Sequence, residues 1–151
     1  MSARRAARPM LALALAVLVL DRLSKLYILE VLALPLVGRV EVWPPYLNFV
    51  MAWNRGINFG LFGSADARWF LVALAVAISL GLGWWALRRG GGWLALGAGL
   101  VIGGALGNAW DRVQYGAVVD FLNMSCCGID NPFAFNLADA GIFAGAVMIR
   151  S

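Results

Sequence analysis

The stretch Trp69–Leu87, WFLVALAVAISLGLGWWAL, contains no charged residue and decides the class of fold. A helix needs about 20 mostly apolar residues to cross the hydrocarbon core of a bilayer. A second uncharged stretch, Trp93–Trp110, follows after Arg88, Arg89 and a short glycine run. The two stretches predict a pair of membrane-spanning helices that are joined by a tight basic turn.

The composition of the whole chain also indicates a membrane protein. Hydrophobic residues make up 62% of the 151 residues and charged residues 13%, far from the balance of soluble domains. The net charge is +4 and the pI is near 9.7. The basic residues form short clusters beside apolar runs, which is typical of membrane orientation and not of a nucleic-acid-binding face.

The cysteine and histidine inventory excludes two classes of site. The chain has no histidine, and its two cysteines are the adjacent pair Cys126 and Cys127. Neighbouring cysteines rarely reach disulfide geometry without a strained ring. A zinc site and a thiol–histidine site are both excluded, because too few ligands exist.

Two further helices are predicted near the ends of the chain. The first covers residues 9–34, with a purely apolar first half and charged residues in its second half. The other covers residues 133–149 and is short for a span, since a helix rises about 1.5 Å per residue. The basic N-terminus mimics a secretory signal peptide, but no small-residue cleavage site follows, so we predict a retained helix.

The distribution of arginines predicts the orientation of these helices. Both the N-terminal cluster and the turn at Arg88 and Arg89 are basic, and basic segments stay on the cytoplasmic side. We therefore predict one domain, residues 1–151, embedded in a membrane with both termini cytoplasmic. Two segments, residues 37–68 and 111–132, then lie on the outer side, where we expect the chemistry.

The outer segments predict the remainder of the fold. Arg39–Trp43 and Tyr46–Met51 are β-prone runs on either side of Pro44-Pro45, which is typical of a small hairpin at the membrane surface, although an irregular loop fits equally well. Residues 124–131 are expected to form a loop or a short surface helix. The predicted fold is an all-α membrane protein with four transmembrane helices and a small β-rich extracytoplasmic element.

Glycines recur at every fourth residue in two of the predicted helices. They are Gly99, Gly103 and Gly107 in one, and Gly141 and Gly145 in the other. Such stripes let helix backbones approach closely in lipid. Tight packing within one chain is the favoured interpretation; contacts between chains would instead favour a non-catalytic scaffold.

Ionisable side chains inside apolar segments are costly and therefore informative. Asp21 and Lys25 are one helical turn apart and can neutralise each other, while Arg22 is expected to snorkel or to pair with another helix. Asn108, Asp111 and Arg112 share one side of their helix through three- and four-residue spacing. We expect these groups to tie the first helix to the third and to support a site rather than form it.

Two aspartates in apolar settings are the strongest catalytic signal. Asp120 lies in Val-Val-Asp-Phe and Asp139 in Asn-Leu-Ala-Asp-Ala, and the predicted topology places both near the outer membrane boundary. Two carboxylates about 3 Å apart share one proton, so one acts as a base on water and the other as an acid toward a carbonyl oxygen. The alternative is that Asp139 is a helix N-terminal charge and Asp120 a loop carboxylate.

In this order, the motifs resemble the lipoprotein signal peptidase family, also called signal peptidase II. The resemblance covers nearly the whole chain. The segments that carry it are DRLSK at 21–25, NRGINFG at 54–60, GNAWDR at 107–112, VDF at 119–121 and FNLAD at 135–139.

The resemblance implies a four-helix membrane aspartyl endopeptidase that needs no cofactor or metal. Its implied substrate is a bacterial prolipoprotein, cut before a diacylglyceryl-modified cysteine. Asp120 and Asp139 match the catalytic aspartates of the family. The positions that match its supporting residues are Asp21, Lys25, Asn54, Gly56, Asn108, Arg112, Asn136 and Ala138.

Two further expectations accompany the resemblance. Ile57 and Asn58 stand where small residues are usual in the family, which bears on the shape of the substrate groove. The expected partners are lipidated prolipoproteins and membrane lipids, with no nucleic acid, and we expect a monomer.

A small four-helix proton-coupled transporter is the alternative function. In that case Asp21 or Asp139 would be a proton-coupled binding carboxylate. A transporter explains charge within the membrane, but it leaves unexplained why the polar residues gather at the outer boundary. It also leaves the outer loop with Asn54 and Gly56 without a role.

Overall fold

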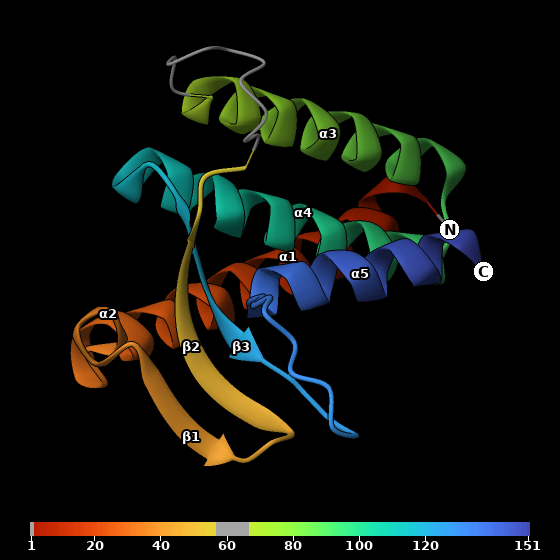
Figure 1. Cartoon of the computed structure of the whole chain (residues 1–151). Helices are drawn as coiled ribbons and strands as arrows, with labels where there is room; N and C mark the ends of the chain where they lie inside the picture. Colours follow the sequence, from red (N-terminus) through yellow and green to blue (C-terminus); the bar gives the residue numbers. More distant parts are fainter. Residues whose placement is uncertain (1, 57–66) are drawn as a thin grey trace.

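The computed structural model describes residues 2–56 and 67–151, so Ile57 and Asn58 lie outside the described residues. The long helices are α1 (Ala3–Leu26), α3 (Arg68–Arg89), α4 (Gly92–Tyr115) and α5 (Leu137–Arg150). Helix α4 packs against each of the other three and forms the centre of the bundle (Figure 1). Both chain ends lie at one end of the bundle, and the short helix α2 (Leu34–Val37) lies at the other.

Helix α1 begins earlier than the sequence predicts. It starts at Ala3 rather than near Pro9, because Ser2 caps it: the Arg5 backbone N–H donates to Ser2 Oγ at 3.4 Å. Pro9 therefore lies inside the helix. At its other end α1 passes into a π-helical turn, Tyr27–Val31, before α2.

Two helices, among the residues that the structure describes, are long and apolar enough to cross a membrane. These are α3 and α4. Helix α1 carries Asp21, Arg22 and Lys25 in its second half, and α5 has 14 residues. Length and composition thus bear out two of the predicted spans, whereas the count of four remains a proposal.

A small antiparallel sheet extends from one side of the bundle (Figure 1). Its strands are β1 (Arg39–Trp43), β2 (Leu47–Asn54) and β3 (Val118–Asn123), in the order β1-β2-β3. The predicted β-rich element is confirmed, and the hairpin rather than the irregular loop is present. Strand β3, which carries Asp120, was not predicted.

Strand β3 is held by apolar contacts with the π-helical turn after α1 and with α2. Val119 and Phe121 form one buried cluster with Ile28 and Leu34. Nearly every residue of β3 is buried, so its sequence lacks the polar alternation that identifies a half-exposed strand. The burial fixes the backbone on either side of Asp120.

The glycine stripes pack against helices of the same chain. A methyl group added to Gly103 would lie 2.8 Å from Val17 Cβ of α1, and one added to Gly104 would lie 2.7 Å from Ile142 Cγ1 of α5. Both distances are too short for carbon atoms, so these glycines permit the close approach of α4 to two neighbours. The interpretation as packing within one chain fits this arrangement.

Candidate active site

Asp139 lies in the first turn of α5 and helps to start that helix. Asn136 caps the helix: its Oδ1 accepts from the Asp139 backbone N–H at 2.9 Å. In return, Asp139 Oδ2 accepts from the Asn136 backbone N–H at 3.2 Å. This reciprocal capping box fixes the Asp139 carboxylate relative to the backbone. Asp139 therefore does lie at a helix N-terminus, as the alternative interpretation of this residue predicts.

The other carboxylate oxygen of Asp139 reaches toward α4. Asp139 Oδ1 accepts from Asn108 Nδ2 at 2.9 Å. Asn108 lies beside the polar residues of the same helix, as its spacing predicts. The helix pair α4–α5 thus positions Asp139 from both sides.

Asp120 projects from the middle of β3 and is 4% exposed. Its Oδ1 accepts from Asn136 Nδ2 at 2.7 Å. The Asn136 amide also lies 3.3 Å from the Val119 carbonyl and 3.2 Å from Asn108 Oδ1. One fully buried asparagine therefore contacts both strand β3 and the cap of α5.

The structure brings the two predicted aspartates into one polar cluster. Asn136 bonds to Asp120 through its side chain and to Asp139 through its backbone, and Asn108 bonds to Asp139 and Asn136. Two amide side chains thus connect two carboxylates that lie on different elements. The arrangement is a hydrogen-bonded acid pair at the start of a helix, with Asp120 buried and Asp139 half-buried.

The electrostatic setting of Asp120 favours its protonated form. Burial, followed by the charge of Asp139, raises the pKa of Asp120 from its ordinary 3.8 to about 6. Hydrogen bonds from Asn54 and Asn136 act in the opposite direction. A carboxyl with this pKa keeps its proton to a higher pH than an ordinary aspartate does.

A buried lysine holds the elements that carry both aspartates. Lys25 Nζ lies 2.7 Å from Asp21 Oδ2 and 2.7 Å from Asp111 Oδ2, and all three side chains are fully buried. It also donates to Asn108 Oδ1 at 3.3 Å. Because α1 and α4 supply these groups, the lysine joins the two helices as predicted.

The two carboxylates beside Lys25 each bind a backbone amide next to a candidate catalytic residue. Asp21 Oδ1 accepts from the Ala138 N–H at 3.1 Å, one residue before Asp139. Asp111 Oδ2 accepts from the Val119 N–H at 3.1 Å, one residue before Asp120. Lys25 thus positions both strand β3 and the start of α5 through a carboxylate on each side.

Arg22 completes the ion cluster as a partner between helices. It pairs with Asp111 and lies over the rings of Trp110 and Tyr115 at 5.5 and 5.9 Å. Of the two roles predicted for Arg22, the interhelical one is observed. Two acids and two bases then neutralise one another at the junction of α1 and α4.

Three predicted supporting residues gather beside the acid pair. Arg112 interacts electrostatically with Asp120, Asp139 and Asp111, and none of the described residues accepts a hydrogen bond from its buried Nε. Gly56 lies next to it, since a methyl group there would be 3.4 Å from Arg112 Nη2. Asn54 Oδ1 accepts from the Gly56 N–H at 2.8 Å, and the φ of Gly56 is +90°, where a side chain is disfavoured.

Some groups that contact the candidate site were not predicted from the sequence. Asp111 was assigned to the polar network of α4, but its bond to the Val119 N–H, beside Asp120, was not expected. Its three-residue spacing from Asn108 was the available signal. The backbone amides of Val119 and Ala138 carry no signal of their own in a sequence.

Fold and site together define a helical membrane protein with a hydrogen-bonded acid pair at the end of its bundle. The sequence matches the family described as Signal peptidase (SPase) II over residues 13–151. The chain belongs to the signal peptidase II family.

Individual relatives agree with this assignment. A lipoprotein signal peptidase of Methylobacterium sp. (strain 4-46) is 47% identical over 137 residues, which cover 89% of this chain and 82% of the relative. That of Caulobacter vibrioides is 39% identical and covers 91% and 82% of the two chains. None of these relatives supports the transporter that was kept as an alternative.

A solved structure shares the fold. It is described as a bacterial membrane enzyme structure by the in meso method at 1.9 Å resolution. It superposes with a TM-score of 0.79 at 28% identity and covers 93% of this chain and 89% of that one. The fold described above is therefore that of a known bacterial membrane enzyme.

Proposed function

We propose that this chain is a membrane aspartyl endopeptidase that removes signal peptides from bacterial prolipoproteins, with Asp120 and Asp139 as its catalytic pair. The observation that carries the proposal is the link between the two aspartates through Asn136, whose side chain donates to Asp120 and whose backbone donates to Asp139. The family membership and the names of the relatives support the substrate class.

The acid pair hydrolyses a peptide bond through a shared proton. The ionised carboxylate takes a proton from a water molecule, and the water oxygen attacks the carbonyl carbon of the scissile bond. The protonated carboxyl gives its proton to the carbonyl oxygen at the same time. We assign that proton to Asp120, because burial and the charge of Asp139 raise its pKa to about 6.

The tetrahedral intermediate then breaks at the carbon–nitrogen bond. The leaving nitrogen takes a proton from the pair and departs as the amine of the mature lipoprotein. The signal peptide keeps the new carboxylate. No side chain forms a covalent bond with the substrate in this sequence of steps.

Residues around the pair would bind the peptide. Arg112 has an unpaired Nε and lies among three carboxylates, so it can donate to a substrate carbonyl without losing a bond within the described residues. Asn54 donates to Asp120 from the end of β2, and its Oδ1 accepts from the Gly56 N–H. We assign Arg112, Asn54 and Asn136 to positioning the substrate and the carboxylates.

The membrane arrangement follows from the same elements. We propose four spans, α1, α3, α4 and α5, in the bacterial inner membrane as a monomer, with the termini on the cytoplasmic side. Arg88 and Arg89 end α3 at the end of the bundle where both termini lie, which agrees with the positive-inside rule (Figure 1). The acid pair, at the start of α5, then lies near the outer face, where a lipid-anchored substrate can reach it from the bilayer.

The test is cleavage of a purified diacylglyceryl-modified prolipoprotein in detergent, with mass-spectrometric detection of the signal peptide. Asp120→Asn and Asp139→Asn are each expected to lower the rate by about 10²–10⁴-fold, the range for loss of a general acid or base. Asp130→Asn, which changes an exposed carboxylate in the loop after β3, is the matched control.

Two outcomes would contradict the proposal. Wild-type rates in either aspartate variant would remove that carboxylate from the reaction. Cleavage at a bond other than the one before the lipidated cysteine would contradict the proposed specificity while leaving the acid pair in place.

A further inference from the structure

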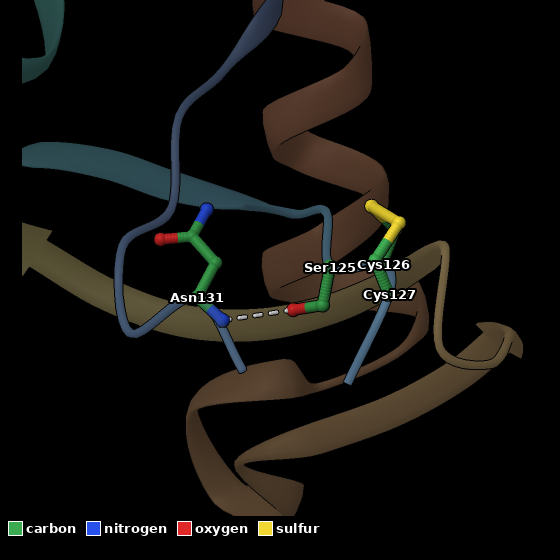
Figure 2. Close-up of a disulfide and its surroundings, with 4 residues drawn as sticks. All are labelled: Ser125, Cys126, Cys127 and Asn131. Carbon is green, nitrogen blue, oxygen red and sulfur yellow. Dashed lines mark hydrogen bonds between the residues drawn. A yellow bond between two sulfur atoms is a disulfide. The ribbon is translucent and has the colours of Figure 1, made fainter. Parts of the chain in front are cut away.

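The loop between β3 and α5 contains a feature that the proposed hydrolysis does not use. Cys126 and Cys127 are joined by a disulfide, although adjacent cysteines rarely form one (Figure 2). Both residues are exposed. The bond is therefore open to reagents in the surrounding solution.

The disulfide lies inside a tight turn. The Ile129 N–H donates to the Cys126 carbonyl at 3.0 Å, and the two residues between them, Cys127 and Gly128, have φ values of +63° and +79°. Two left-handed residues in succession define a type I′ turn, which glycine, asparagine and aspartate normally occupy. A cysteine is disfavoured at the first of these positions. The disulfide joins Cys127 to Cys126 and therefore limits the conformations that the turn can adopt.

Hydrogen bonds connect this turn to the two elements that carry the acid pair. The Asn131 N–H donates to Ser125 Oγ at 3.0 Å (Figure 2), and Asn131 Nδ2 donates to the Met124 carbonyl at 3.1 Å. Asn123, the last residue of β3, donates to the carbonyls of Asn131 and Phe133 at 2.8 and 2.9 Å.

The segment that follows continues to the cap of α5. The Phe135 N–H donates to the Leu122 carbonyl at 2.9 Å, and Leu122 N–H returns a bond of 2.8 Å. Asn136 comes next and bonds to both aspartates. The loop is thus held at its start by the strand of Asp120 and at its end by the cap that positions Asp139.

We propose that Cys126–Cys127 is a reversible thiol–disulfide exchange site whose reduction loosens this loop and lowers the rate of cleavage. The reductant is a dithiol. One of its thiolates attacks a sulfur of the pair and forms a mixed disulfide, and the other cysteine leaves as a thiolate that takes a proton.

The second thiol of the reductant completes the exchange. It attacks the mixed disulfide, so the reductant ends as a disulfide and Cys126 and Cys127 end as two thiols. Two electrons and two protons have then passed to the protein. In the proposed topology the loop faces the outer, oxidising side, where the disulfide is the resting form.

Thiol counting tests the exchange itself. Purified protein is alkylated with N-ethylmaleimide before and after treatment with dithiothreitol, and its intact mass is measured. We expect no adduct before reduction and two after it, with the bond restored by oxidised glutathione. Two adducts without reduction, or none after it, would overturn the proposal.

Hydrogen exchange and cleavage test the consequence. Reduction should speed the exchange of the Ile129 and Asn131 amides and should lower the cleavage rate several-fold. The double variant Cys126→Ser/Cys127→Ser is the control, because dithiothreitol should leave its exchange and its rate unchanged. Equal exchange and equal rates in oxidised and reduced wild type would overturn the regulatory part.

The cleavage measurement rests on the proposed function, whereas thiol counts and hydrogen exchange do not. If the protein cleaves no prolipoprotein in either redox form, the proposed function fails. If it cleaves equally well in both forms while the thiol count changes, only the regulatory inference fails.

Discussion

Lys25 Nζ lies 2.7 Å from Asp111 Oδ2, and this contact connects α1 to the strand that carries Asp120. The same ammonium group lies 2.7 Å from Asp21, which binds the amide next to Asp139. One cation therefore supports, through two carboxylates, the backbone next to both candidate catalytic groups. Its removal is the sharpest test of how the site is held.

Lys25→Met should unfold the protein at a lower temperature and abolish cleavage. The variant keeps the volume of the side chain but leaves Asp21 and Asp111 buried without their shared cation, a change that typically costs about 3–5 kcal/mol. Thermal unfolding in detergent measures the effect. Arg4→Met, which changes an exposed base on the same helix, is the control.

A combined variant separates charge from shape. Lys25→Met with Asp21→Asn and Asp111→Asn should recover part of the lost stability, because the uncompensated charges are gone. If Lys25→Met alone were as stable as the wild type, the ion cluster would have no positioning role.

Cleavage should decline as the pH rises above about 6. The active form needs one proton on the pair, and Asp120, whose pKa is raised to about 6, loses it in that range. The value of kcat/KM should then fall about tenfold per pH unit on the alkaline side. A rate that stays constant between pH 6 and 8 would contradict a shared proton with this apparent pKa.

Asn54→Ala should move that alkaline limb to higher pH. The Asn54 hydrogen bond favours the ionised form of Asp120 and lowers its pKa, so its loss raises the pKa further. The measurement is the pH profile of kcat/KM, with Arg55→Ala as the neighbouring control. A limb that moves to lower pH in Asn54→Ala would show that the bond acts in the opposite sense.

Asp120→Asn should stabilise the fold at neutral pH while it abolishes activity. The folded pKa of Asp120 lies above its unfolded value, so the stabilising contribution of its protonated form is complete below about pH 3.8 and is lost as the pH rises through about 6. The asparagine side chain of the variant carries no charge at any pH, so the variant avoids this loss of folding stability. The loss amounts to at most about 3 kcal/mol at pH 7.

Unfolding temperatures at pH 4 and pH 7 measure this difference. The variant should exceed the wild type at pH 7 and match it at pH 4, and Asp130→Asn should show no such divergence. A variant that is less stable than the wild type at pH 7 would mean that the Asp120 carboxylate is stabilised by its surroundings.

Gly104→Ala should destabilise the bundle and displace α5. The added methyl group would meet the Ala138 carbonyl and Ile142, and overpacking of this kind costs about 1–3 kcal/mol. Cleavage should fall as well, because Asp139 moves with the start of α5. Gly81→Ala on α3 is the matched control, since none of the described residues outside its own helical turn lies within 4 Å of its added carbon.

The helices could be predicted from hydropathy, because an uncharged apolar run as long as Trp69–Leu87 is typical of a membrane-spanning helix. The bounds were less accurate where local contacts decide them: Ser2 starts α1 before Pro9, and α5 begins at Leu137 because Asn136 caps it. The hairpin of β1 and β2 could be seen in its β-prone runs. Strand β3 could not, since its side chains are buried on both sides and show no alternation.

The sequence offers candidate site residues but not the contacts between them. Asp120 and Asp139 stood out as acids in apolar surroundings, and the family resemblance brought them together. Nothing local in the sequence says that Asn136 joins them or that Asp111 binds the Val119 amide, because both contacts join segments that only the fold brings together. The disulfide of Cys126 and Cys127 was likewise unexpected, since it needs a turn whose left-handed residues include a cysteine.

The neutral cluster of Asp21, Arg22, Lys25 and Asp111 also bears on biogenesis. Ribosomes make α1 before α4, so in the proposed four-span arrangement Asp21 and Lys25 can enter the bilayer already paired, whereas Arg22 must wait for Asp111. A nascent chain that stalls before α4 is complete would leave that arginine exposed to lipid. Correct placement of Arg22 in the bilayer therefore depends on the completion of α4.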